Sequence, residues 1–202
     1  MDREEQKRLL GCFRMPNGLR IRSRASSIRN VFVAAIVPTA APSAGEIRQV
    51  LDIFALEPSE LLCSYCGEQA TEWDHLRPLV LGGRPTGYPS SIRNLVPACG
   101  KCNQSKGNKE WRSWIRSGAK WSPVTRGKQG LDERVRRLEA FEAWAQCIPV
   151  DIASLVPPAV WDGYWRLLDE VLAKLDEADA AAVEIAKATR GEATAAAGRG
   201  SR

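Results

Sequence analysis

The sequence has only one histidine, His75, among its 202 residues. No other imidazole can therefore replace it in any reaction that the chain carries out. The sequence also lacks an apolar run approaching about eighteen residues, so no transmembrane helix is expected. The charged residues 1–8 are followed by no apolar segment of the kind that a secretory signal needs. These absences argue against a membrane protein and lead us to expect a cytoplasmic one.

Cysteine is present in an informative pattern. Four of the six cysteines form two Cys-x-x-Cys pairs, which are Cys63 with Cys66 and Cys99 with Cys102. In a reducing compartment, pairs at this spacing favour a metal over a disulfide, and four thiolates complete a tetrahedral zinc site. We therefore predict a structural zinc ion for which His75 is not needed as a ligand. Cys12 and Cys147 lie outside the pattern, and no role is assigned to them.

The positive charge is concentrated in two stretches. The net charge is +5, and residues 101–137 carry eleven Lys or Arg against three acidic residues. The segment from Arg14 to Arg29 carries five Arg and no acidic residue, whereas eight acidic residues outnumber six basic ones from Ala159 onward. Basic clusters are typical of proteins that bind a polyanion, because each phosphate contact releases counterions. Since these stretches flank the cysteine pairs, they favour nucleic acid as the partner over an ordinary solvated surface.

Helices are predicted on both sides of the cysteine pairs. Ser43 and Glu46 form a capping-box pattern that starts one helix, and Pro58 ends it. Further helices are predicted over 2–13, from near Asn103 through Trp111 and Trp114, over 131–146, and after Pro157-Pro158, where an apolar stripe runs from Trp161 to Leu175. The tryptophans at 111, 114 and 121 are expected in the core, with stacking on nucleic-acid bases as the alternative.

Short strands are predicted within the cysteine-paired region, at Glu72–Leu76 and Ile92–Val96. The segment between them, with Gly82-Gly83, reads as a loop, and so does the Gly- and Lys-rich segment 117–130. The apolar run from Val31 to Val37 is compatible with a strand, but periodicity does not decide this. Short strands among many helices predict the α+β class.

A set of polar residues lies between and beside the cysteine pairs. The sequence reads Asp74-His75 with Pro78 following, then Gly82-Gly83, then Asn94-Leu95, and then Asn103 and Lys106 directly after the second pair. This arrangement, over about residues 61–110, resembles the HNH nuclease family. The ββα-metal motif of that family is a strand ending in Asp-His, a loop with an Asn, and a helix beginning with Asn or His. Many members carry two Cys-x-x-Cys pairs around it, so the resemblance implies a small zinc-stapled core within mainly helical flanks.

The resemblance also implies a role for each matched residue. His75 would be the general base that takes a proton from the attacking water. Asp74 and Asn103 would hold one divalent cation, Mg²⁺ or another, against the scissile phosphate. Asn94 would orient the loop or the histidine ring instead of binding the cation. The implied activity is hydrolysis of phosphodiester bonds in DNA, for which a restriction or defence enzyme and a phage or mobile-element nuclease are both suitable settings.

DNA is the expected partner. The candidates for contacts with it are Lys101, Lys106, Lys109 and Arg112. Lys106 lies one helical turn beyond Asn103, so it is expected to point toward the same region and to meet a phosphate. A homodimer is an open alternative, because the stripe from Trp161 to Leu175 is compatible with a short coiled-coil seam as well as with packing on the helix 131–146.

We expect four parts along the chain. They are a helical region 1–58 with its Arg-rich segment, a nuclease core 59–116 with zinc, a helical region 117–188 and a flexible tail 189–202.

A rival from another class is a zinc-ribbon-like module that binds nucleic acid without cutting it. Taken singly, His75 and Asp74 could be a structural hydrogen-bonded pair, Asn94 a turn residue and Asn103 a helix cap. Their joint occurrence around two cysteine pairs favours the nuclease.

Overall fold

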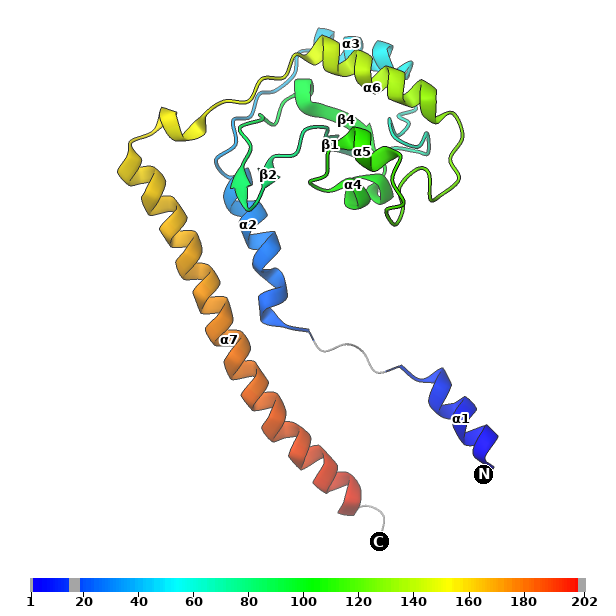
Figure 1. Ribbon diagram of the computed structural model, residues 1–202, viewed down its shortest axis with the longest axis vertical. Helices are drawn as coiled ribbons and strands as arrows, with labels where there is room; N and C mark the ends of the chain where they lie inside the picture. Colours follow the sequence, from blue (N-terminus) through cyan, green and yellow to red (C-terminus); the bar gives the residue numbers. More distant parts are fainter. Residues whose placement is uncertain (1, 15–18, 200–202) are drawn as a thin grey trace. The chain divides into compact units, whose positions relative to one another are not determined.

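The computed structural model describes residues 2–14 and 19–199 of the protein, and Figure 1 traces its elements along the chain. In chain order they are α1 (Arg3–Cys12), η1 (Ile21–Arg24), α2 (Ala25–Ala34), α3 (Ala44–Phe54), β1 (Glu72–His75), β2 (Val80–Leu81), β3 (Arg84–Pro85), η2 (Ile92–Asn94), β4 (Leu95–Ala98), α4 (Gly100–Lys106), α5 (Trp111–Ile115), α6 (Leu131–Ala145), η3 (Ile152–Leu155) and α7 (Pro158–Arg199). Helices predominate and short antiparallel strand pairs lie among them, which confirms the α+β class.

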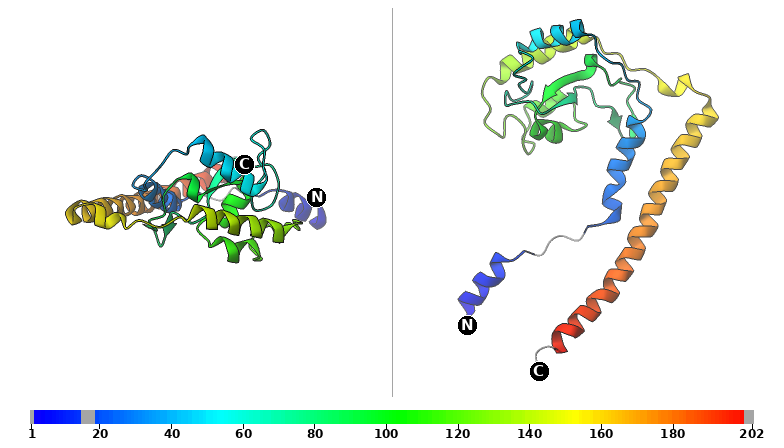
Figure 2. Two further views of the ribbon diagram at one scale, coloured as in Figure 1. Left: turned by 90° about the horizontal axis from the view of Figure 1, so that it is seen from above. Right: turned by 180° about the vertical axis from the view of Figure 1, so that it is seen from behind.

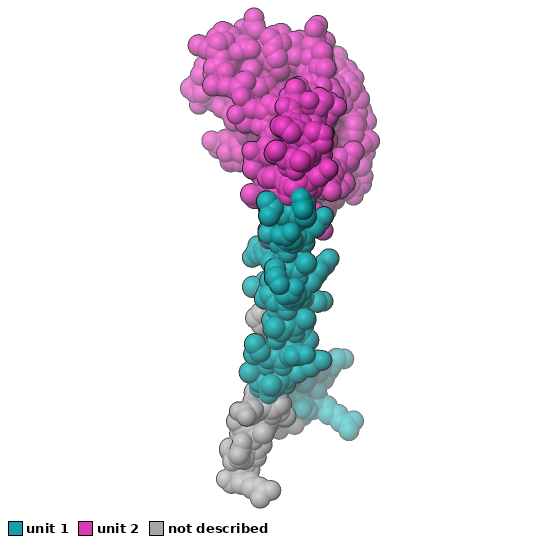
Figure 3. Space-filling model, turned by 90° about the vertical axis from the view of Figure 1, so that its left-hand side faces the viewer, with its two compact units in different colours: residues 1–26, 166–202 teal, residues 27–165 magenta. Residues whose placement is uncertain are grey.

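The chain divides into two compact units, which Figure 3 shows in different colours. One comprises residues 1–26 and 166–202, and the other comprises residues 27–165. Both cysteine pairs and the Asp74-His75 dipeptide belong to the second unit. The boundaries expected near residues 58 and 116 fall inside it, because helices from both flanks pack on one core with the cysteine-paired region.

The centre of the second unit is the antiparallel pair β1–β4. Its register places Asp74 opposite Val96 and His75 opposite Leu95. Side chains alternate between the two faces of a strand, so Asp74 and His75 point to opposite faces. Asp74 is buried, as is Val96 opposite it, whereas His75 and Leu95 are only half-buried. The strand therefore directs the carboxylate inward and leaves the imidazole ring partly accessible.

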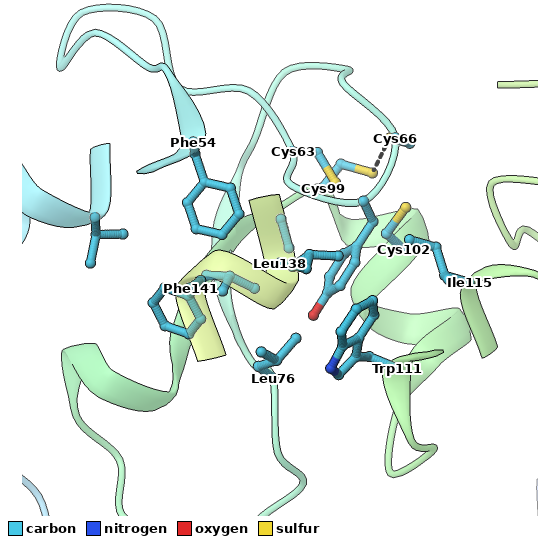
Figure 4. Close-up of a cluster of buried hydrophobic side chains, with 14 of the residues drawn as sticks. Phe54, Cys63, Cys66, Leu76, Cys99, Cys102, Trp111, Ile115, Leu138 and Phe141 are labelled. Carbon is cyan, nitrogen blue, oxygen red and sulfur yellow. Dashed lines mark hydrogen bonds between the residues drawn. The ribbon is translucent and has the colours of Figure 1, made fainter. Parts of the chain in front are cut away.

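Two helices with apolar faces enclose this core. Ser43 caps α3 through a complete capping box with Glu46, as the sequence predicted, and α6 confirms the helix predicted over 131–146. The two helices run side by side in Figures 1 and 2. Phe54 of α3 meets Phe141 of α6 with ring centroids 5.6 Å apart. Figure 4 shows these rings in the same cluster as the cysteine side chains, so the flanking helices and the cysteine-paired region share one hydrophobic core.

A small hairpin replaces part of the loop expected after β1. Strands β2 and β3 pair with Val80 opposite Pro85, and Gly82 and Gly83 form the turn between them. Both glycines have positive φ angles, 59° and 77°, which suit a two-residue turn that matches the twist of its strands.

Two sequence predictions about elements are wrong, and one open question is answered. The run Val31–Val37, which periodicity left undecided, is no strand: residues 31–34 lie in α2, where Val33 is buried, and residues 35–37 form the turn after it. The second strand begins at Leu95 instead of Ile92, because residues 92–94 form the short helix η2. The helix expected from near Asn103 through Trp114 is two helices, since Gly107 ends α4 with a positive φ of 49°.

The start of α7 within the second unit packs on α2 and the hairpin. Tyr164 donates a hydrogen bond to the carbonyl oxygen of Phe32 over 2.7 Å, and the Arg84 guanidinium lies 4.2 Å from the Trp165 ring centroid. Neither contact is with α6, which was the intramolecular partner expected for this stripe. The remainder of α7 belongs to the first unit, where Asp179 and Asp176 form ion pairs with Arg20 and Arg22.

The last residues of α7 overlap the segment 189–202 that was expected to be flexible. The helix extends to Arg199, and residues 200–202 lie outside the described part, so the flexible tail stays a prediction. Among the described residues, no helix combines the length and the apolar character that crossing a bilayer requires.

Candidate functional site

The four paired cysteines come together as predicted. Cys63 and Cys66 lie in the turn before β1, whereas Cys99 and Cys102 lie at the start of α4, and all four are buried. Their Sγ atoms lie within 4.8 Å of one another, and those of Cys66 and Cys99 are 3.6 Å apart. Tetrahedral zinc with bonds of about 2.3 Å places its sulfurs about 3.8 Å apart. The cluster therefore fits a structural zinc ion.

Arg126 lies against this cysteine cluster, although no sequence pattern pointed to it. Its guanidinium contacts the Sγ atoms of Cys102 and Cys99 at 3.4 and 4.0 Å and pairs with Glu68 at 3.4 Å. Four thiolates around one Zn²⁺ leave a net negative charge, which a guanidinium offsets. The loop 117–130, which carries Arg126, is thus part of the zinc centre's surroundings.

Asp74 is the buried carboxylate of the candidate active site. Its Oδ2 accepts a hydrogen bond from the Tyr65 hydroxyl at 2.6 Å and forms an ion pair with Lys106 Nζ at 3.1 Å. Burial raises the pKa of Asp74, while the ammonium of Lys106 opposes the shift by favouring the carboxylate. Its Oδ1 has no hydrogen-bond partner among the described residues, so one carboxylate oxygen remains free to bind a cation.

Lys106 points toward Asp74 as expected but does not reach the surface. It is fully buried, and its ammonium also donates to the backbone oxygens of His75, at 2.8 Å, and Gly107, at 3.3 Å. Burial lowers the pKa of Lys106, and the nearby carboxylate of Asp74 opposes that shift. The side chain therefore links α4 to β1 inside the core, and contact between Lys106 and a phosphate stays a prediction.

His75 lies on the opposite face of β1 and is half-buried. Burial lowers the pKa of its imidazole to about 4, and the positive charge of Lys106 lowers it further in the same direction. The ring is consequently neutral at physiological pH. A neutral imidazole can accept a proton, which is the state that a general base requires.

Asn94 holds the loop that follows β1. Its Oδ1 accepts a hydrogen bond from the backbone N–H of Arg77 at 2.8 Å. Its Nδ2 donates to the carbonyl oxygens of Arg77 and Pro89, at 3.0 and 3.2 Å. The side chain is buried and thus ties both ends of the segment 77–89 together. These bonds occupy the amide in orienting the loop.

Asn103 lies on α4, three residues before Lys106. Residues three apart share one face of a helix, so the two side chains leave α4 on the same side, and Lys106 reaches Asp74 from there. The Asn103 side chain is half-buried and makes no hydrogen bond within the described part of the chain. An amide oxygen and the free Oδ1 of Asp74 are the hard oxygen donors that Mg²⁺ prefers, with water completing its shell.

The other DNA-contact candidates differ in exposure and in the partners that their side chains already have. Lys101 is exposed and has no ion-pair partner among the described residues. Lys109 donates to the carbonyl oxygens of Ser105 and Lys106 and so caps α4. Arg112 forms ion pairs with three carboxylates, of Glu110, Glu139 and Glu142. Of the four, Lys101 is the residue most available to a phosphate.

The three tryptophans of this region differ in burial. Trp111 and Trp114 are buried in the core, as expected. Trp121 was also expected in the core, which is wrong: it is 41% exposed and lies beside Lys120, with 4.7 Å between the ammonium and the ring centroid.

The sequence pattern missed Tyr65 and Ser90 as well as Arg126. Tyr65 stands between the first two cysteines, and its position inside that pair was the only available signal. Ser90 carried no signal, because its hydroxyl meets the imidazole of His75 through a contact between residues fifteen positions apart.

Comparison with known proteins finds a family match for the central segment of the chain. Residues 63–109, out of 202, match the family model described as HNH endonuclease. Comparisons with curated proteins and with solved structures give no match. The matched segment begins at Cys63 and contains β1, β4, α4 and all four cluster cysteines. Residues 63–109 of the protein are therefore similar to the HNH endonuclease family.

Proposed function

We propose that this protein is a divalent-cation-dependent endonuclease that hydrolyses phosphodiester bonds in DNA. The observation that carries the proposal is the match of residues 63–109 to the HNH endonuclease family. Within this segment Asp74 and His75 lie on β1, and Asn103 lies on α4, which the Lys106–Asp74 ion pair links to β1. Phosphodiester hydrolysis needs a base that deprotonates water and a positive charge near the phosphate. His75 offers the base, and Asp74 and Asn103 offer oxygen ligands for a cation that would supply the charge.

In this mechanism, His75 takes the proton of the attacking water. Asp74 and Asn103 would hold one Mg²⁺ or similar ion, which stabilises negative charge on the phosphate and on the leaving oxygen when bound. Asn94 keeps the loop after β1 in place, and Lys106 fixes the distance between α4 and β1. Lys101, Lys109 and Arg112 remain candidates for DNA contacts, with Lys101 the most accessible.

A pair of variants tests the division between the two metal sites. Asp74→Ala and Asn103→Ala are expected to weaken the dependence of DNA cleavage on added Mg²⁺ while the zinc content per chain stays unchanged. Elemental analysis measures zinc, and plasmid nicking over a range of Mg²⁺ concentrations measures the dependence. Asp74→Ala also leaves the buried Lys106 ammonium without its partner, so circular dichroism first checks that each variant is folded. Loss of zinc in Asn103→Ala, or in Asp74→Ala that remains folded, would show that the two sites are not separate.

The plasmid-nicking assay also distinguishes the proposed nuclease from its rival, a module that only binds nucleic acid. A zinc-ribbon-like binding module would retard DNA in a gel shift with and without Mg²⁺ and would cut nothing. A restriction or defence role further predicts cutting at defined sequences, which appears as discrete fragments from a plasmid of known sequence. One such centre acts on one strand, so a single chain is expected to nick. Cutting both strands needs two centres, for which a homodimer remains a prediction.

A further inference from the structure

The imidazole of His75 has one side-chain partner within the described residues. Its Nε2 lies 2.9 Å from the Oγ of Ser90, and both residues are half-buried. Ser90 lies in the segment between β3 and η2, outside the set of residues to which the sequence pattern gave a role. Because Nε2 is engaged in this contact, Nδ1 is the ring nitrogen that is left for another partner.

The backbone of Ser90 is held by a segment that precedes the HNH domain. Its N–H donates to the carbonyl oxygen of Pro38 at 2.9 Å, and its carbonyl oxygen accepts from the N–H of Ala40 at 3.2 Å. Thr39 forms a parallel β-bridge with Ser90 between these bonds. Asn94 holds the preceding carbonyl, that of Pro89. The hydroxyl thus stands on a backbone fixed from both sides, as expected of a group that orients another.

The direction of the hydrogen bond decides which nitrogen can act as a base. A serine hydroxyl can donate or accept, and a neutral imidazole carries its hydrogen on one nitrogen only. If Ser90 donates to Nε2, the hydrogen is on Nδ1, and neither nitrogen has a free lone pair for water. If Ser90 accepts from Nε2–H, the lone pair of Nδ1 is free. Only the second arrangement allows His75 to take a proton.

We propose that Ser90 is a positioning residue that accepts the Nε2 hydrogen of His75 and leaves Nδ1 as the nitrogen that deprotonates the attacking water. This inference rests on the proposed nuclease function. An O–H bond of water breaks and its proton goes to Nδ1, while the water oxygen bonds to phosphorus. The bond from phosphorus to the leaving oxygen breaks, and that oxygen keeps the electron pair and takes a proton from solvent.

The contact with Ser90 gains strength as the reaction proceeds. Protonation of Nδ1 makes the ring an imidazolium, so the Nε2–H donor becomes charged. Hydrogen bonds from charged donors are shorter and about twice as strong as neutral ones. Ser90 therefore stabilises the protonated product of the first step in addition to orienting the ring.

Nitrogen NMR tests the ring arrangement without any cleavage assay. Because His75 is the sole histidine, protein labelled with ¹⁵N-histidine gives signals from one ring only. At neutral pH, in zinc-loaded protein, we expect a protonated, pyrrole-type signal for Nε2 and a pyridine-type signal for Nδ1. Ser90→Ala should broaden the Nε2–H proton by exchange with water, whereas Ser90→Thr should preserve it. A wild-type ring protonated on Nδ1 would overturn the proposal.

Kinetics then test the consequence for the reaction. Ser90→Ala should lower kcat for plasmid nicking by about 10-fold or more with little change in KM, which is the usual scale for groups that orient a reacting residue. Ser90→Thr should restore most of the rate. Ser91→Ala is the matched control, since the neighbouring hydroxyl makes no capping bond to η2.

The two proposals fail in different ways. A wild-type rate in Ser90→Ala, at unchanged zinc content, would overturn the role of Ser90 alone. A wild-type protein that binds zinc, shows the expected ring spectrum and cuts no DNA would instead overturn the proposed function and leave the His75–Ser90 contact as a structural one.

Discussion

At the scale of single residues, the strongest constraint is the buried pair of Asp74 and Lys106. The ammonium has no exposed surface and reaches the carboxylate and two backbone oxygens. A charge in such a place is tolerated only while its partner and hydrogen bonds remain. The pair therefore links the last turn of α4 to the strand that carries the candidate base.

Removing the lysine should destabilise the fold. We expect Lys106→Ala to lower the free energy of unfolding by about 3–5 kcal/mol, because it leaves the Asp74 carboxylate buried without its countercharge. Lys101→Ala, an exposed position on the same helix, should change it by less than about 0.5 kcal/mol. Urea denaturation of zinc-loaded protein measures both. Equal midpoints for the two variants would contradict the role of the pair.

The lowered pKa of His75 gives a prediction for pH dependence. The base acts when it is unprotonated. A pKa of about 4 in the folded protein keeps the imidazole unprotonated at pH values well below 6.5, the usual pKa of histidine. The acid limb of kcat/KM should therefore fall near pH 4. The unfolded chain takes up this proton first, so the contribution of His75 to stability is lost between pH 6.5 and about 4. An acid limb at pH 6.5 or above would show that burial does not control this ring.

At the scale of elements, the segment 38–40 connects the N-terminal flank to the candidate site through Ser90. Ala40→Pro removes the N–H that donates to the Ser90 carbonyl oxygen. It should lower the plasmid-nicking rate about as much as Ser90→Ala, at unchanged zinc content. Ala41→Pro is the control, because its N–H makes no backbone hydrogen bond in the described structure. If both variants cut at the same rate, the bridge does not support the site.

Local signals in the sequence were enough for some elements and not for others. The capping box at Ser43 predicted the start of α3 because its bonds join residues three apart. The prediction of one continuous helix missed the break between α4 and α5, although a glycine such as Gly107 commonly ends a helix because it tolerates a positive φ. The contacts of Ser90 with 38–40 and of Arg126 with the thiolates join distant parts of the chain, so no local pattern could indicate them.

For the candidate site too, local sequence features were predictable and contacts that depend on tertiary packing were not. Cys63, Asp74, His75 and Asn103 were found because the spacing of the motif is itself a local feature of the sequence. The burial of Lys106 was not predicted, because whether a lysine one turn beyond Asn103 faces solvent or the strand depends on how α4 packs. The sequence thus indicated the candidate reactive groups, and the tertiary structure gives the contacts that surround them.

At the scale of the whole molecule, the zinc cluster joins the turn before β1 to the start of α4 at one edge of the shared hydrophobic core. Cys99→Ser should lower the melting temperature sharply and reduce bound zinc, because binding of a structural ion contributes directly to folding. Cys12→Ser, an exposed cysteine outside the cluster, should leave both unchanged. Elemental analysis and thermal denaturation measure these quantities. Folded protein that contains no zinc would contradict the assignment of the cluster.

The central claim is that this molecule cuts DNA with His75 as its base. The most direct measurement is the rate of plasmid nicking by zinc-loaded wild-type protein and by His75→Ala, each with and without added Mg²⁺. We predict Mg²⁺-dependent nicking by the wild type and a loss of at least ~10²-fold in His75→Ala, with zinc content and melting temperature unchanged, since no other imidazole is present. Nicking by His75→Ala at close to the wild-type rate would contradict the account.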